Sequence, residues 1–132
     1  MRKGKTCSGP NPYNWDVKIT SALRRIWRFS PQRTAALVAA RTAENPKEVR
    51  CAKCGCSTNV KLAAVDHRTP VVPLSGFDSW DAFIQRLQST ELDVLCEACH
   101  STKTKAENAQ RALHRKTARA AAAADKKARG KK

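Results

Sequence analysis

The segment Leu95-Cys96-Glu97-Ala98-Cys99-His100 decides how the chain is expected to fold, because it repeats the cysteine spacing of Cys51-Ala52-Lys53-Cys54. Two cysteines separated by two residues let one tight turn present both sulfurs to a single ion, and four thiolates suit tetrahedral zinc. Such an ion adds folding free energy to a short chain with few large apolar residues. We therefore predict a structural zinc; the alternative is four buried or redox-active thiols. The predicted ligands are Cys51, Cys54, Cys96 and Cys99.

Two further cysteines lie outside this predicted ligand set. Cys56 could exchange with Cys54, but a spacing of one residue chelates a single ion less readily than a spacing of two. Cys7 belongs to a polar N-terminal arm, residues 1–14, and we expect it to be a free thiol.

On the N-terminal side of the first cysteine pair, two helices are predicted within a basic region, residues 15–47. Over 15–28 the apolar residues recur at helical spacing and define one face. Ser30-Pro31 then favours a new helix over about 31–43, with Ser30 as its cap, and Asn45-Pro46 ends it. The predicted face of the first helix consists of Trp15, Ile19, Leu23, Ile26 and Trp27.

The region between the cysteine pairs is predicted as a strand, a loop and a short helix. Val60–Val65 indicates a strand that ends at Asp66-His67, and Pro70 and Pro73 favour an extended loop over 68–74. A short helix is predicted at 78–87, followed by a second apolar run, Leu92–Leu95. After His100 an alanine-rich helix is expected, which frays beyond about residue 115 into a disordered basic tail.

Charge is distributed unevenly along the 132 residues. The chain carries 26 Lys and Arg against 11 Asp and Glu, a net charge of +15. The sums are +8 over residues 1–50, −2 over 51–102 and +9 over 103–132. A near-neutral centre between two cationic arms suits a compact site held on a phosphate backbone. Solvated arms, or arms that bind RNA, ribosomes or acidic lipid, are the alternatives.

No apolar run approaches the about 18 residues needed to cross a bilayer, and residues 1–30 lack the apolar core of a signal peptide. We therefore expect a cytoplasmic protein without a membrane partner. In a reducing cytosol, paired cysteines are more often metal ligands than disulfides.

The motifs, taken in order, resemble those of the HNH endonucleases, and especially of small phage-type members with four zinc-binding cysteines. They are the first cysteine pair, Val65-Asp66-His67-x-x-Pro70, and Leu95-Cys96-x-x-Cys99-His100-x-x-Lys103-Thr104-x-x-Glu107. The resemblance implies an α+β fold, in which a ββα-metal core at 48–111 follows the two helices and precedes a basic segment at 112–132. It also implies a phage-encoded enzyme acting in the host cytoplasm.

By this resemblance, His67 is the general base, and Asp66 and His100 hold a catalytic divalent ion. An imidazole takes a proton near neutral pH, and a cation offsets charge on the reacting phosphate. Oxygen and nitrogen ligands suit Mg²⁺, Mn²⁺, Ni²⁺ or Zn²⁺. Because neighbouring strand residues point to opposite faces, Asp66 and His67 are expected to share one site only at a distorted strand end.

One position departs from the family pattern. Glu91 stands where the family's middle asparagine positions the loop that bears the base, so Glu91 is expected to pin that loop differently. Glu107 is expected to pair with a basic neighbour such as Arg111 at i+4, and His114 is interpreted as a solvated residue. The predicted DNA contacts are Lys103, Arg68, Arg111 and Arg115.

Two functions follow from these patterns. The first is metal-dependent hydrolysis of DNA phosphodiester bonds, and the second is a catalytically degenerate, zinc-containing nucleic-acid-binding protein, which Glu91 favours. Contacts to phosphate position a protein on DNA without specifying sequence. The N-terminal helices are predicted to pack onto the zinc core, or else to serve as a DNA clamp or a docking face for a phage or host protein.

Overall fold

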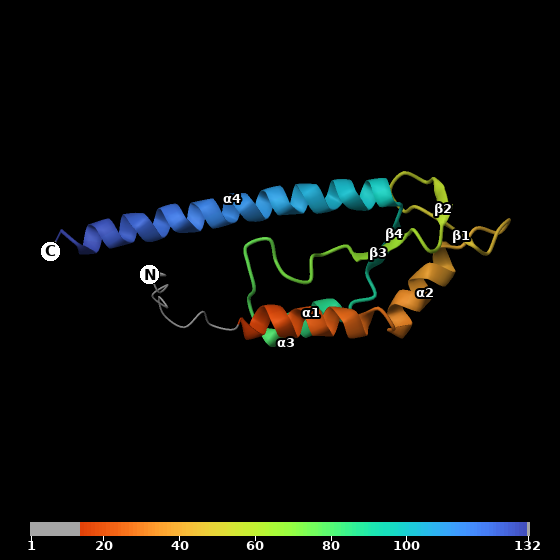
Figure 1. Ribbon diagram of the computed structural model, residues 1–132, viewed down its shortest axis with the longest axis horizontal. Coiled ribbons are helices and arrows are strands. Elements are labelled where there is room, and N and C mark those ends of the chain that lie inside the picture. Colours follow the sequence, from red (N-terminus) through yellow and green to blue (C-terminus); the bar gives the residue numbers. More distant parts are fainter. Residues whose placement is uncertain (1–13, 132) are drawn as a thin grey trace, which may run out of the picture.

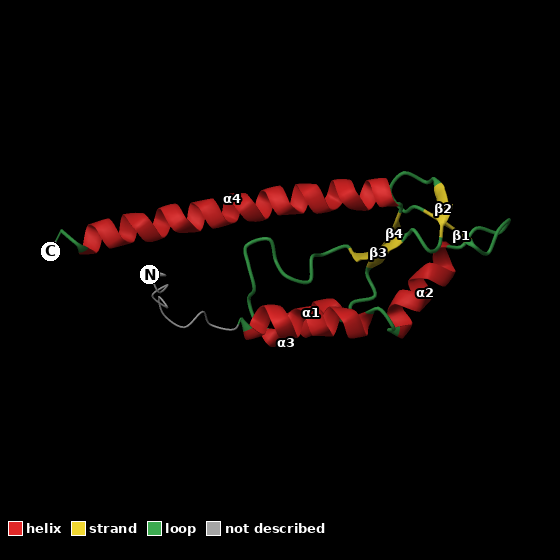
Figure 2. Cartoon of the chain, in the orientation of Figure 1, coloured by secondary structure: helices red, strands yellow, loops and turns green. Residues whose placement is uncertain are grey.

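The computed structural model describes residues 14–131, and within that range the chain is a mixed α+β fold. Residues 1–13, with Cys7 and nearly all of the predicted arm, lie outside the described residues, as does Lys132. The described residues form four helices and two small antiparallel sheets (Figures 1 and 2). The elements are α1 (Trp15–Trp27), α2 (Pro31–Ala40), β1 (Glu48–Arg50), β2 (Ser57–Asn59), β3 (Ala64–His67), α3 (Trp80–Leu87), β4 (Leu92–Leu95) and α4 (Glu97–Arg129).

The helix starts follow from their capping residues. The side chain of Asn14 accepts a hydrogen bond from the Val17 N–H at the start of α1. Ser30 does the same for Arg33 at the start of α2, where Pro31 occupies the first turn. These caps satisfy backbone donors that the first turn leaves unpaired. The predicted Ser30 cap is confirmed.

One sheet flanks the first cysteine pair in the sequence, and both strands of the other sheet follow it. Strands β1 and β2 pair across the knuckle with Val49 opposite Thr58, a hairpin that the sequence did not predict. Strands β3 and β4 pair from Ala64 opposite Leu95 to His67 opposite Leu92. The predicted strand over Val60–Val65 is therefore partly wrong: residues 60–62 form a turn, and the strand begins at Ala64.

Two apolar clusters hold these elements together. Cys51, Leu95 and Cys96 are buried around the cysteine pairs. Val71, Phe83 and Leu87 form the second cluster, onto which Leu23 and Trp27 of α1 pack, so α1 lies beside α3 (Figure 1). Of the predicted apolar face of α1, Leu23 and Trp27 pack on this second cluster. The helix therefore packs there and not around the cysteines. Trp15, Ile26 and Phe29 stay exposed.

The last helix is longer than predicted. The sequence suggested fraying beyond about residue 115, but α4 continues to Arg129, and residues 112–131 are all exposed. Alanine has the highest helix propensity, and a helix already anchored at its N-terminus extends without a new nucleation cost. Among the described helices, including this one, none is both long and apolar enough to span a bilayer.

Candidate metal centre and active-site cavity

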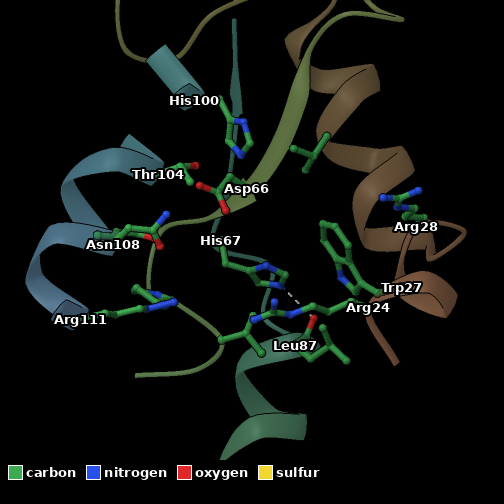
Figure 3. A pocket seen from close by; sticks show the side chains of 14 residues that line it. Arg24, Trp27, Arg28, Asp66, His67, Leu87, His100, Thr104, Asn108 and Arg111 are labelled. Atoms are coloured by element: carbon green, nitrogen blue, oxygen red, sulfur yellow. Dashed lines mark hydrogen bonds between the residues drawn. The ribbon is translucent and has the colours of Figure 1, made fainter. Parts of the chain in front are cut away.

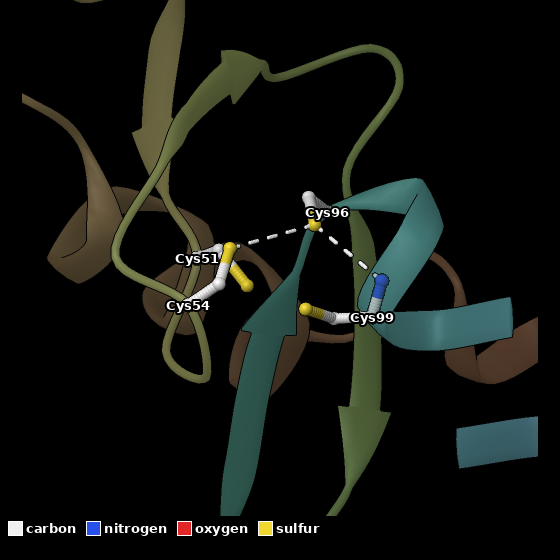
Figure 4. Close-up of side chains that lie close together, drawn as sticks. All are labelled: Cys51, Cys54, Cys96 and Cys99. Carbon is white, nitrogen blue, oxygen red and sulfur yellow. Dashed lines mark hydrogen bonds between the residues drawn. The ribbon is translucent and has the colours of Figure 1, made fainter. Parts of the chain in front are cut away.

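The four predicted zinc ligands converge on one point. The sulfur atoms of Cys51, Cys54, Cys96 and Cys99 all lie within 4.8 Å of one another (Figure 4). The Sγ atoms of Cys54 and Cys96 are 3.8 Å apart, which matches the edge of about 3.8 Å in a tetrahedron with Zn–S bonds of about 2.3 Å. The cluster can therefore hold a structural metal ion such as zinc.

Local backbone geometry explains why the two pairs present their sulfurs. In the first knuckle, the Gly55 N–H donates to the Cys51 carbonyl oxygen, and Gly55 has a φ of 74°, where a side chain would be strained. In the second, Cys96 is the N-cap of α4, and its sulfur accepts a hydrogen bond from the Cys99 N–H at 3.5 Å.

The thiols of the cluster differ in their tendency to ionise. Burial opposes ionisation of Cys51, but backbone hydrogen bonds from Cys54, Cys96 and Lys53 outweigh it and lower the pKa to about 6. The pKa of Cys54 is also lowered, chiefly by a hydrogen bond from Cys56. A hydrogen bond to Cys96 raises the pKa of Cys99 to about 12. Four thiolates this close together need a cation to ionise jointly, which fits a metal-binding role.

Cys56 is a fifth thiol next to the cluster. It is exposed, and its sulfur lies 3.1 Å from that of Cys54, closer than two ligands of one zinc would sit. Its hydrogen bond to Cys54 raises the pKa of Cys56 to about 12. Cys56 does not belong to the group of four mutually close sulfurs, in agreement with the spacing argument.

A second site lies beside β3 and the part of α4 from His100 to Arg111. A cavity of about 460 Å³ is lined by Asp66 and His67 from β3 and by His100 from α4 (Figure 3). The structure thus brings together the three residues predicted for catalysis. Other polar and charged lining residues come from α1 and α4: Arg24, Arg28, Thr104, Glu107, Asn108 and Arg111.

Asp66 and His67 share the cavity for a reason different from the predicted one. β3 keeps regular pairing through His67, so the strand end is not distorted. In Figure 3 Asp66 points toward His100 and Thr104 of α4, whereas His67 points toward Trp27 and Leu87. The two side chains therefore alternate as strand geometry requires, and they share a cavity because it extends around the end of the strand.

His67 is fixed from two sides. Its Nε2 lies 3.0 Å from the Leu87 carbonyl oxygen, and its ring centroid lies 4.6 Å from that of Trp27. Because a carbonyl oxygen can only accept, Nε2 carries the proton, and in the neutral ring Nδ1 keeps the free lone pair. The residue is 7% exposed. The hydrogen bond therefore leaves Nδ1 as the ring nitrogen of His67 that can accept a proton.

Lys103 lies at the edge of this site. Its ammonium donates to Asp66 Oδ2 at 2.6 Å and to the His67 carbonyl oxygen at 2.7 Å. Glu107 Oε1 lies 3.6 Å away at i+4. Glu107 thus pairs with a basic neighbour, as predicted, but that neighbour is Lys103 and not Arg111. Arg111 Nη2 instead donates to the Val72 carbonyl oxygen at 2.9 Å.

Glu91 and Arg68 lie away from the cavity. Glu91 is exposed and does not line it. Its carbonyl oxygen accepts from the Arg68 N–H at 3.0 Å, and the Arg68 side chain pairs with Asp93 at 2.8 Å. These contacts extend the β3–β4 ladder, so the backbone of Glu91 and the side chain of Asp93 pin the segment after His67. Arg115 is exposed, one turn of α4 beyond Arg111.

Three further residues that line the cavity were not predicted from the sequence: Arg24, Trp27 and Arg28. Arg24 and Arg28 are four residues apart, so they share a face of a helix, and that spacing was the available signal. What the spacing could not reveal is that α1 packs against α3 and so reaches the cavity.

Comparison with known proteins returned nothing: no family model, no curated protein and no solved structure matches the chain. None of these comparisons places the chain in a family.

Proposed function

We propose that the protein is a metal-dependent endonuclease of the HNH type that hydrolyses DNA phosphodiester bonds and is stabilised by zinc at the four cysteines. One observation carries the proposal: Asp66, His67 and His100 line a single cavity. That cavity also contains three arginines, Arg24, Arg28 and Arg111, so its charge suits a phosphate group.

The donor set suits a hard or borderline divalent cation. Asp66 offers a carboxylate oxygen and His100 an imidazole nitrogen, a combination that accepts Mg²⁺, Mn²⁺, Ni²⁺ or Zn²⁺. Lys103 contacts Oδ2 of Asp66, so Oδ1 is the oxygen assigned to the ion. When bound, a divalent cation offsets the negative charge that develops on the reacting phosphate and the leaving oxygen.

The chain's own groups supply the remaining parts of the reaction. Nδ1 of His67 takes the proton of the attacking water, while Nε2–H stays hydrogen-bonded to the Leu87 carbonyl oxygen. The arginines bind the phosphate oxygens and hold the scissile group in the cavity. By the HNH resemblance, the products carry a 5′-phosphate and a 3′-hydroxyl.

Two features of the site favour a second function, nucleic-acid binding without cleavage. Lys103 already neutralises Asp66, and His67 is 7% exposed. Both features suit a zinc-containing protein that binds nucleic acid without cutting it.

A nicking assay on supercoiled plasmid separates the two functions. We expect the wild type to nick in at least one of Mg²⁺, Mn²⁺ and Ni²⁺, and His67→Ala to lose about 10²- to 10⁴-fold of that rate. His114→Ala is the matched control, because His114 is exposed on α4. Zinc content is measured on every sample to show that the four-cysteine site is intact.

Each outcome decides between the functions. An inert, zinc-loaded wild type would favour the binding protein. Equal nicking by the wild type and His67→Ala would exclude His67 as the base.

A further inference from the structure

The exposed half of α4 carries a row of arginines that begins in the cavity. Residues 112–129 extend past α1 and α3 (Figure 1), and no described residue of this segment is buried. Arg111 lines the cavity, and Arg115 and Arg119 follow at i+4 and i+8. Each such step turns by only about 40° and advances about 6 Å along a helix. We call Arg111, Arg115 and Arg119 the arginine row.

Some of the other cations on this segment lie off the row and some lie on it. Lys116 and Lys127 are turned by about 100° and 120° from Arg115 when α4 is projected at 3.6 residues per turn, whereas Lys126 and Arg129 fall within about 40° of it. Lys116 and Lys127 are therefore the two cations of the segment that lie to one side of the row.

The arginine row has no acidic partner beyond the cavity. In the described part of α4 after Glu107, the acidic residue is Asp125, and it pairs with Arg129 at 3.2 Å. Neither Arg115 nor Arg119 forms an ion pair with any described residue. Two guanidinium groups in register with a cavity arginine are therefore available to an external anion.

The composition of the segment selects the type of partner. Leu113, 64% exposed, is its one large apolar side chain, which is too little for a protein-docking face. A second copy of this chain, net charge +15, would be repelled. Residues 112–131 contain no Phe, Tyr or Trp on which unpaired bases would stack. The unpaired, regularly spaced arginines instead match a regularly spaced polyanion, the backbone of duplex DNA.

We propose that Arg115 and Arg119 contact successive backbone phosphates of the duplex that flanks the strand held in the cavity. This inference rests on the proposed function for its substrate class. It adds that α4 fixes the direction in which DNA leaves the site. Contacts of this kind position the substrate without reading its sequence.

The test compares two double variants of the full-length, zinc-loaded protein with equal loss of charge. Arg115→Gln with Arg119→Gln removes the two arginines of the row that lie beyond the cavity, and Lys116→Gln with Lys127→Gln removes two cations that lie off the row. Gln is a good helix former, so α4 should persist, and circular dichroism checks this. Binding of a short fluorescein-labelled duplex is followed by fluorescence anisotropy between about 50 and 200 mM salt without added divalent ion.

We expect the slope of log K against log salt to fall by about 1.8 for the row variant, or 0.9 for each lost phosphate contact. The lysine variant should change the slope by much less. Equal changes in the two variants, no change in the row variant, or no binding by the wild type would each overturn the inference.

The nicking assay distinguishes this inference from the proposed function. If the wild type fails to nick while the slopes differ as expected, the nuclease proposal fails and the arginine row stands. If the wild type nicks and the slopes are equal, the row alone is wrong.

Discussion

The ammonium group of Lys103 lies 2.6 Å from Asp66 Oδ2, on the carboxylate that is proposed to bind a divalent ion. The same group donates to the carbonyl oxygen of His67. One cation of the chain therefore links α4 to the strand end that carries both residues. An ammonium and a divalent ion repel each other, so the two compete for Asp66.

Replacing Lys103 should therefore strengthen divalent binding. For Lys103→Met we expect Mn²⁺ to bind about fivefold more tightly, since a partly exposed pair contributes about 1 kcal/mol. Isothermal titration of the zinc-loaded protein measures this. Lys105→Met, an exposed position on the same helix, should leave the affinity unchanged, and Asp66→Asn should abolish binding. Unchanged or weaker binding by Lys103→Met would contradict the competition.

Four cysteines of the cluster should bind zinc, and the neighbouring Cys56 should not. Cys99→Ser is expected to lose both its zinc and its cooperative thermal unfolding. Structural zinc contributes about 10–16 kcal/mol to the folding of small zinc domains, which is as large as the whole free energy of unfolding of most domains. Cys56→Ser should keep both properties. Metal analysis and a thermal melt measure them. Zinc retained by Cys99→Ser, or lost from Cys56→Ser, would show that Cys56 is a ligand.

Phe83 of α3 should be the most sensitive residue of the second apolar cluster, because it is completely buried in the cluster onto which α1 packs. Phe83→Ala is expected to reduce the free energy of unfolding by about 3–5 kcal/mol. Phe29 is 88% exposed, so Phe29→Ala should change it by less than about 0.5 kcal/mol. Urea unfolding followed by circular dichroism compares the two. Similar losses would mean that α1 and α3 do not pack as described.

The ion pair between Asp78 and Arg86 should make stability depend on pH in the acid range. Arg86 Nη2 donates to Asp78 Oδ1 at 2.6 Å, and this hydrogen bond lowers the pKa of Asp78 below 3.8. A carboxyl whose pKa is depressed by folding stabilises the protein above its unfolded pKa, and that contribution disappears as the pH falls through the folded pKa.

Asp78→Asn should accordingly melt at a lower temperature than the wild type near neutral pH. The difference should shrink as the pH falls below about 4. Melting curves of both proteins across this range measure it. A difference that stays constant with pH would show that the charge of Asp78 does not contribute to stability.

The cysteine cluster was predictable from sequence because it depends on spacing within short turns. The Ser30 cap and the short helix α3 were predictable for the same reason. β1 and β2 are three residues each, too short to show a period. The length of α4 was missed because the absence of packing residues was weighed above the helix propensity of alanine.

The candidate site was predictable only where its residues belong to one motif. Asp66, His67 and His100 were assigned from local patterns that the resemblance joined. The partners of these residues come from elsewhere in the chain: Trp27 packs on His67, and the Leu87 carbonyl oxygen holds its Nε2. Every residue has a backbone carbonyl, so no sequence pattern could single out that of Leu87, and its contact with His67 is visible only in the tertiary structure.

Cys99 and His100 are consecutive residues in the first turn of α4, one facing the sulfur cluster and the other the cavity. An ion held by the four sulfurs would therefore also fix the rotation of that turn, and with it the direction of the His100 imidazole. Loss of the ion would free the turn to rotate, so His100 would lose its fixed position although every side chain that lines the cavity is still present.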